Sequence, residues 1–142
     1  GAIVLLDGPL GSGKTTLVRG LAHGLGLSGE YDVLSPTFAL LNIYPTAIPL
    51  YHADCYRLSA FEAADLDLVE EARNGILAVE WCKNAVLSER GDLCLALDYC
   101  GPGARRVNIL ASRQLSDKIQ SIMAADFRAR RASAPAGINM KE

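Results

Sequence analysis

Residues 2–25, AIVLLDGPLGSGKTTLVRGLAHGL, decide how the chain folds. They open with an unbroken apolar run, which is typical of a buried parallel strand. A glycine-rich loop follows, and after it Leu17, Leu21 and Leu25 recur at every fourth position, as they do along one face of a helix. The order strand, glycine-rich loop and helix indicates an α/β protein.

The loop at residues 8–15, which we call the glycine loop, matches the pattern G-x-x-x-x-G-K-[ST] at every fixed position. Glycines let main-chain N–H groups approach phosphate oxygens, and the start of the following helix adds partial positive charge. The Lys14 ammonium group can reach the β- and γ-phosphates, and the Thr15 hydroxyl can ligate Mg²⁺, which prefers oxygen. The pattern predicts a site for a nucleoside triphosphate with Mg²⁺, contacted by Gly8, Gly11, Ser12, Gly13, Lys14, Thr15 and Thr16.

Such a site also needs an acidic side chain at the end of a neighbouring strand to hold magnesium. Asp54 ends the segment IPLYHAD, and Glu80 ends the segment GILAVE. Either carboxylate could lie at the carboxyl edge of a sheet, where α/β proteins bind ligands, and the spacing does not rank the two. His52 could orient Asp54 or a substrate, or it could be an ordinary hydrogen-bonded structural histidine.

The rest of the chain alternates between β-like and helical patterns. We expect strands within residues 37–44, 48–54, 75–81, 92–99 and 105–111, and helices within 61–73 and from about residue 112 or 116. The fold class is therefore α/β, a P-loop NTPase-like three-layer sandwich with a mixed central sheet and flanking helices. We expect one domain over residues 1–131 and a disordered tail over residues 132–142.

Composition narrows the classes of function. Half of the 142 residues are hydrophobic and 21% are charged, as in globular domains, and a net charge of −2 gives no general attraction to nucleic acid. No apolar run approaches the ~20 residues of a membrane-spanning helix. The four cysteines form no C-x-x-C pair, which argues against zinc and favours reduced thiols in the cytoplasm. The abrupt start in a strand suggests that an N-terminal segment is missing.

Four segments in order, GPLGSGKTTLVRGLAHGLG, SPTFALLNIY, HADCYRL and AVEW, resemble the TsaE family, formerly YjeE, over residues 3 to about 111. The members of this family are bacterial P-loop ATPases that take part in forming threonylcarbamoyladenosine in tRNA. The resemblance implies a cytoplasmic enzyme that binds ATP with Mg²⁺ and hydrolyses it slowly. It also implies regulation of a complex of the partner proteins TsaD and TsaB, with tRNA involved only indirectly.

The resemblance assigns roles to individual residues as well. It implies that Asp54 is important for ATP turnover, together with Lys14, and that Glu80 completes the magnesium site with Thr15. Ser35 to Phe38, the run SPTF, would be a switch-like loop beside the γ-phosphate, with Thr37 as its hydroxyl near the metal.

Two nucleotide contacts outside the glycine loop are also implied by the resemblance. Trp81 would lie against the nucleotide. A basic residue in the turn GPGARRV, either Arg105 or Arg106, would touch it, and we take Arg106 as the candidate.

The chain departs from the family pattern in two places. It begins at the first strand, whereas family members usually carry an earlier segment that helps to enclose the base. Pro9 stands where an acidic residue is common, and proline has no N–H to donate to phosphate.

Two other functions fit a phosphate loop. A small-molecule kinase would need an acceptor site and usually an arginine-bearing lid. A nucleotide-dependent binding module would hydrolyse hardly any ATP.

Overall fold

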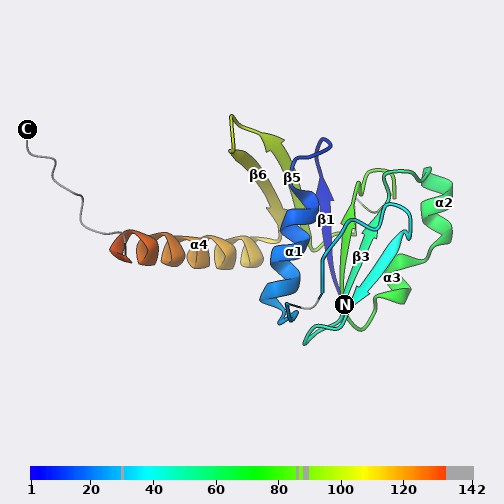
Figure 1. Ribbon diagram of the computed structural model, residues 1–142, viewed down its shortest axis with the longest axis horizontal. Helices are drawn as coiled ribbons and strands as arrows, with labels where there is room; N and C mark the ends of the chain where they lie inside the picture. The colour runs from blue at the N-terminus through cyan, green and yellow to red at the C-terminus, as the bar shows by residue number, and fades with distance from the viewer. Residues whose placement is uncertain (30, 86, 88–89, 134–142) are drawn as a thin grey trace, which may run out of the picture. The chain divides into compact units, whose positions relative to one another are not determined.

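The computed structural model describes residues 1–29, 31–85, 87 and 90–133, and the chain divides into two compact units. Within the described residues, the first unit, Gly1–Ala111, holds a six-stranded sheet and three helices (Figure 1). The second unit, Ser112–Glu142, holds helix α4 (Arg113–Ser133). The single domain over residues 1–131 stays a prediction, and residues 134–142 of the predicted tail lie outside the described residues.

The central sheet has the strand order β2-β3-β4-β1-β5-β6. Its strands are β1 (Ala2–Asp7), β2 (Leu41–Tyr44), β3 (Leu50–Asp54), β4 (Ile76–Glu80), β5 (Leu93–Tyr99) and β6 (Arg105–Ala111). Strands β3, β4, β1 and β5 are parallel, whereas β2 and β6 run antiparallel to their neighbours at the two edges. The prediction of a mixed sheet in an α/β fold is confirmed.

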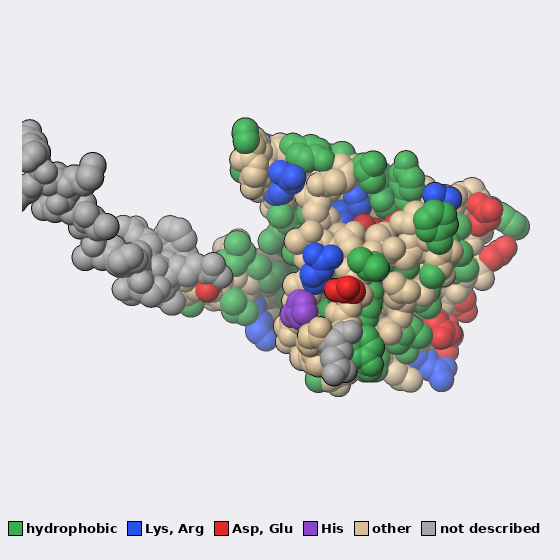
Figure 2. Space-filling model, in the orientation of Figure 1, with side chains coloured by type: hydrophobic (Ala, Val, Ile, Leu, Met, Phe, Trp, Pro, Cys, Tyr) green, Lys and Arg blue, Asp and Glu red, His purple; other side chains and the backbone are tan. Residues whose placement is uncertain are grey.

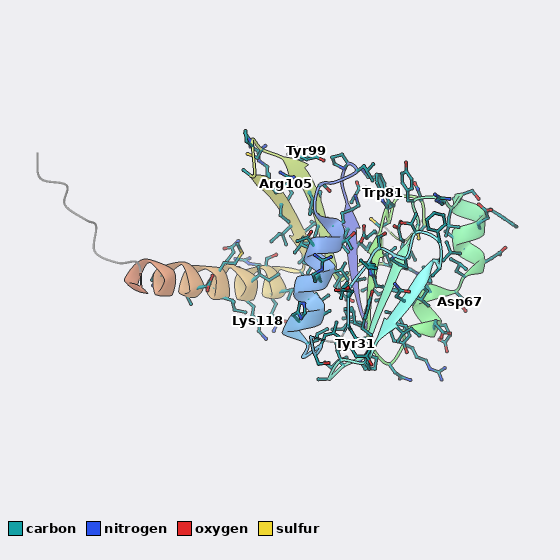
Figure 3. The ribbon with its side chains drawn as sticks, viewed as in Figure 1. Tyr31, Asp67, Trp81, Tyr99, Arg105 and Lys118 are labelled. Atoms are coloured by element: carbon teal, nitrogen blue, oxygen red, sulfur yellow. The ribbon has the colours of Figure 1, made fainter. Side chains whose placement is uncertain are left out.

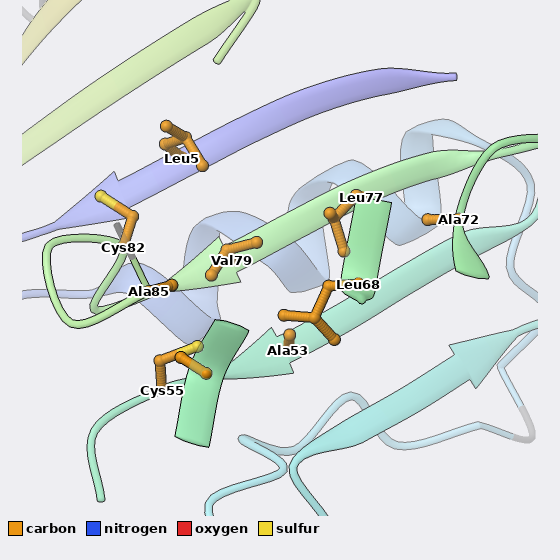
Figure 4. Packing of buried hydrophobic residues seen from close by; sticks show 10 residues of the cluster. Leu5, Ala53, Cys55, Leu68, Ala72, Leu77, Val79, Cys82 and Ala85 are labelled. Carbon is orange, nitrogen blue, oxygen red and sulfur yellow. The ribbon is translucent and has the colours of Figure 1, made fainter. Parts of the chain in front are cut away.

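Helices cover both faces of this sheet, because alternate side chains of a strand point to opposite faces. The helices of the first unit are α1 (Lys14–Gly24), α2 (Ala60–Asp65) and α3 (Leu68–Glu71). Leu5 packs in one cluster with Leu77 and with Leu68 of α3 (Figure 4). The next residue along β1, Leu6, packs in a second cluster with Val18 of α1. These two cores make the three layers that the sequence predicted.

Two predicted segments are shorter or more divided than their patterns suggested. The helix expected over residues 61–73 is two short helices, and Asp67 between them has a φ of 41°, which no α-helix accommodates. The strand expected within residues 37–44 begins only at Leu41, because residues 37–39 form a turn and Leu40 has a φ of 66°. A hydrophobic pattern does not report such local left-handed conformations.

The surface of α2 and α3 carries acidic side chains, as Figure 2 shows at the edge of the first unit. The exposed acidic residues of this region are Glu62, Asp65, Asp67, Glu70 and Glu71. In the part of the chain that the structure describes, none of the helices is long and apolar enough to cross a membrane.

Candidate functional site

The glycine loop joins the end of β1 to the start of α1, and its backbone requires glycine. Gly8, Gly11 and Gly13 have φ angles of 141°, 74° and 106°, which side chains other than glycine rarely adopt. A Cβ atom on Gly8 would also lie 2.2 Å from the carbonyl oxygen of Leu97. The glycines therefore leave main-chain groups uncovered at the surface of the loop. A phosphate group could approach these main-chain groups closely.

A cavity of about 330 Å³ opens beside this loop, and we call it the loop cavity. It is bordered by the glycine loop, the first turn of α1, the segment at residues 35–37 and the ends of β3 and β4. The predicted site residues that line it are Gly11, Gly13, Lys14, Thr15, Thr16, Thr37, Asp54, Glu80 and Trp81. Residues distant in sequence are thus brought to one place, at the carboxyl edge of the parallel strands.

Lys14 is almost fully buried in this site, with 4% of its surface exposed. Its Nζ donates hydrogen bonds to the carbonyl oxygens of Gly8, at 2.8 Å, and Pro9, at 3.0 Å. The ammonium group also lies 4.0 Å from the ring centroid of Trp81, within the range of a cation–π interaction. Lys14 is therefore held against the loop and the indole ring.

Burial lowers the pKa of the Lys14 ammonium below its usual value of 10.5, and the nearby carboxylates of Glu80, Asp54 and Asp7 oppose this shift. Desolvation destabilises a buried cation, and a bound anion would compensate for that cost.

Glu80 lies at the end of β4 and faces the first turn of α1. Its Oε1 accepts a hydrogen bond from the hydroxyl of Thr15, at 2.8 Å, and lies 2.9 Å from Nε2 of His52. The side chain of Glu80 is 4% exposed. Of the two acidic candidates, Glu80 is the one that contacts the threonine predicted to bind Mg²⁺.

Asp54 occupies the neighbouring position at the end of β3 and has different partners. Its Oδ2 accepts hydrogen bonds from the hydroxyls of Ser35 and of Thr37, the latter at 2.7 Å, and its Oδ1 accepts one from the main-chain N–H of Tyr56, at 2.9 Å. The two hydroxyls are themselves 2.9 Å apart. Asp54 therefore anchors the segment that carries Thr37, whereas His52 contacts Glu80 and not Asp54.

Trp81 follows Glu80 directly and has a φ of 59°, an uncommon value for a bulky residue. Its main-chain N–H donates to the carbonyl oxygen of Leu6, at 3.0 Å, and its ring lies 4.8 Å from the ring of Tyr56. This backbone conformation directs the indole into the loop cavity, where the sequence predicted a nucleotide contact. Figure 3 shows Trp81 at this end of the sheet.

The two arginines that the sequence placed in a turn are the first two residues of β6, and it is Arg105 that faces the glycine loop. Its guanidinium lies 4.5 Å from the ring centroid of Tyr99, and both side chains are labelled in Figure 3. Arg105 lines a second hollow that also contacts Gly11, Ser12 and Gly13. The guanidinium of Arg106 instead donates to Sγ of Cys100, and its contact with nucleotide stays a prediction.

The residues of the loop cavity fit a nucleotide with Mg²⁺. Their donor set is made of hydroxyl and carboxylate oxygens, which a hard cation prefers. In the described residues, no group of three or more His, Cys, Asp or Glu side chains could hold a metal ion by itself. Mg²⁺ suits such a site, because it usually takes one or two protein carboxylates together with phosphate oxygens and water. Ser12, which lines the second hollow and not the loop cavity, has a fully buried hydroxyl with no hydrogen-bond partner among the described residues.

Sequence reasoning missed Tyr56 as a member of the site, and it placed Ser35 in the switch-like loop without assigning a contact to its hydroxyl. Ser35 bonds to Asp54, and Tyr56 contributes its N–H to Asp54 and its ring to the cavity wall. Both residues stand in the segments SPTFALLNIY and HADCYRL, and these segments were the signal that could have found them.

The mixed sheet, the glycine loop between β1 and α1, and the oxygen-rich cavity beside it define a P-loop-type α/β protein. The family model for the threonylcarbamoyl adenosine biosynthesis protein TsaE matches residues 1–106, and the chain belongs to this family.

Individual relatives agree with this assignment. The chain is 42% identical over 115 residues to a tRNA threonylcarbamoyladenosine biosynthesis protein TsaE from Nostoc, covering 77% of this chain and 70% of that protein. It is 43% identical over 113 residues to the protein of that name from Treponema pallidum, covering 77% and 82%. Matches to relatives from Synechocystis and Streptomyces coelicolor span only 54% and 60% of those proteins.

A solved structure resembles the chain as well. The crystal structure of YdiB from Bacillus subtilis superposes with a TM-score of 0.63 at 25% identity, over 88% of this chain and 78% of that one. The fold class and the family thus agree with the expectations from sequence, and TsaE proteins are named for tRNA threonylcarbamoyladenosine biosynthesis.

Proposed function

We propose that the loop cavity binds ATP with Mg²⁺ and that the chain hydrolyses this ATP slowly. The observation that carries the proposal is the hydrogen bond from Thr15 to Glu80 beside the glycine loop. It joins the hydroxyl that the P-loop pattern assigns to Mg²⁺ with a carboxylate on the adjacent strand, the pair that P-loop enzymes use for the metal.

The chain's own groups have distinct tasks in this proposal. The amides of the glycine loop and the Lys14 ammonium bind the phosphates and oppose the negative charge that develops during transfer. Thr15 and Glu80 are the groups that would hold Mg²⁺, which, when bound, neutralises phosphate charge. Asp54 orients the attacking water, and the hydroxyls of Ser35 and Thr37 hold its carboxylate in place. Trp81 supplies a further contact to the nucleotide from the cavity wall, and Arg105 can supply one from the other side of the glycine loop.

Slow turnover is supported by the composition of the cavity wall. Among the described residues that line it, Lys14 is the basic side chain, and arginine is absent. P-loop enzymes that hydrolyse rapidly use an arginine to stabilise the transition state, often one supplied by a partner protein. We propose that a complex of TsaD and TsaB is the partner, in the cytoplasm, and that ATP binding and hydrolysis regulate its formation of threonylcarbamoyladenosine in tRNA.

The exposed side chains near the cavity support regulation by a partner. Phe38, which follows Thr37, is 84% exposed, and Arg57 lies over its ring at 4.2 Å. Aromatic residues and arginine are enriched at protein–protein interfaces, so we propose that Phe38 and Arg57 contact the partner.

The alternative of a binding module with little turnover shares the same site and is favoured by the same lack of arginine in the cavity wall. Single-turnover hydrolysis, measured with and without TsaD and TsaB, separates the two functions. Stimulation by the partners supports the regulated ATPase, and no hydrolysis in either condition supports the module. A small-molecule kinase would instead transfer phosphate to an acceptor in a screen.

Titration calorimetry with the variant Lys14→Ala tests nucleotide binding. The variant is expected to lose ATP binding, because the cavity loses its main positive charge. Lys118→Ala, at an exposed lysine of α4, is the matched control and should bind as the wild type does. Unchanged ATP affinity in a folded Lys14→Ala variant would show that the nucleotide site is assigned wrongly.

A further inference from the structure

His52 is a fully buried histidine in the middle of β3, one strand away from Glu80. Its register partner on β4 is Ala78, whose small side chain leaves room for the imidazole beside the next residue on that face, Glu80. Nε2 of His52 lies 2.9 Å from Oε1 of Glu80. A buried polar ring costs free energy in a sheet unless it is hydrogen-bonded, so this contact explains why a histidine is tolerated there.

The surroundings of the ring define its tautomer. Nδ1 of His52 is buried and has no hydrogen-bond partner among the described residues. A proton on Nδ1 would therefore be buried without an acceptor, whereas a proton on Nε2 can be donated to Glu80. His52 accordingly acts as a donor to the carboxylate.

Two donors thus converge on one oxygen of Glu80. Oε1 accepts from Nε2–H of His52 and from the Thr15 hydroxyl, at 2.8 Å, while Oε2 has no donor among the described residues. Bonds from two different elements, β3 and α1, fix both the rotamer and the plane of the carboxylate. Oε2 is then the oxygen left for a ligand in the cavity that Glu80 lines.

We propose that His52 is a positioning residue that holds Glu80 so that Oε2 is presented to the hydrated Mg²⁺ of the bound nucleotide. The inference rests on the proposed function, because it assigns a task within the magnesium site. Residues that orient metal-binding groups typically change metal affinity about 10- to 100-fold when they are replaced.

The test compares ATP affinity by titration calorimetry in the presence of Mg²⁺ and in the presence of a chelator. The ratio of the two affinities is the magnesium gain. His52→Leu, which keeps the bulk but removes the donor, is expected to lose about tenfold or more of this gain while the metal-free affinity stays unchanged. His52→Gln can place an N–H near the position of Nε2 and should keep most of the gain. Tyr44→Phe alters a neighbour whose ring lies 6.3 Å from that of His52 and serves as the packing control.

The possible outcomes separate the inference from the proposed function. A magnesium gain in His52→Leu equal to that of the wild type would overturn the inference and leave the proposed function intact. Equal losses with and without Mg²⁺ would also overturn it, because they indicate a packing role. No magnesium gain in the wild type would overturn both. If His52→Leu does not fold, His52→Asn is used in its place, because the shorter amide side chain cannot reach Glu80. Equal magnesium gains in the His52→Asn and His52→Gln variants would then refute the inference.

Discussion

Asp54 and Glu80 are register partners on neighbouring parallel strands, yet their carboxylates bond to different parts of the protein. Glu80 is tied to the first turn of α1 through Thr15, and Asp54 is tied to the segment at residues 35–37 through two hydroxyls. The two acidic residues are therefore adjacent in the sheet, but their carboxylates have different hydrogen-bond partners. This arrangement is the reason that we propose Glu80 for the metal and Asp54 for the switch-like loop beside the γ-phosphate.

This division predicts different defects for two isosteric variants. Glu80→Gln is expected to lose most of the magnesium-dependent part of ATP affinity, because the neutral amide cannot replace a carboxylate near Mg²⁺. Asp54→Asn should bind ATP nearly as well as the wild type. Its rate of hydrolysis should fall by about 100-fold or more, as expected for a side chain that acts mainly in the transition state. Calorimetry and single-turnover hydrolysis with partners present measure the two effects.

Asp65→Asn, at an exposed position of α2, is the control for the loss of one negative charge. It should change neither quantity. If Asp54→Asn hydrolyses ATP normally with its partners, Glu80 is the principal acidic residue for turnover, and the assignment of separate tasks is wrong.

The contact between Lys14 and Trp81 predicts an optical signal for nucleotide binding. Trp81 is the single tryptophan of the chain, so its emission reports on one place. The ammonium group lies 4.0 Å from the ring centroid in the structure, and phosphate is expected to draw it away. Tryptophan emission should therefore change on adding ATP with Mg²⁺ and saturate with the dissociation constant found by calorimetry. Binding in calorimetry without any change of emission would mean that the indole does not sense the nucleotide.

The sequence predicted several residues that the structure brings together around one cavity. The glycine loop, Lys14 and Thr15 follow a pattern whose every position has a physical reason, and the apolar runs placed Asp54 and Glu80 at strand ends. It could not predict which acid would meet Thr15, because that depends on the strand order β3-β4-β1.

Other features depend on contacts that no local pattern contains. Nothing in the segment around His52 indicates that its partner is 28 residues away on β4. The left-handed backbone of Trp81 is set by its hydrogen bond to β1 and by its place beyond the end of β4. The choice between Arg105 and Arg106 likewise depends on which face of β6 each one occupies, and a one-residue shift of register exchanges the two faces.

The backbone of the glycine loop makes a prediction about stability. Gly8→Ala would place a Cβ atom 2.2 Å from the carbonyl oxygen of Leu97 at a φ of 141°, so we expect a loss of about 1–3 kcal/mol or more in the free energy of unfolding. Gly20→Ala is the matched control, because nothing lies within 4 Å of its added Cβ inside α1. That variant should be more stable by up to about 1 kcal/mol. Urea unfolding measures both values, and similar effects at the two positions would contradict the loop geometry.

The cysteines make a prediction about pH. Burial raises the pKa of the Cys55 thiol to about 11, so at pH 8 only about one molecule in a thousand carries its thiolate, the form that reacts with disulfide reagents. The exposed thiol of Cys100 should therefore react with such a reagent well before Cys55 does in the folded protein, and denaturant should remove the difference.

Because the unfolded Cys55 thiol ionises near pH 9 and the folded one near 11, the stability contributed by Cys55 is complete below pH 9 and is lost as the pH rises toward 11. Cys55→Ala should consequently lose less stability over this range in urea unfolding, and an identical loss in variant and wild type would show that Cys55 does not titrate in this way.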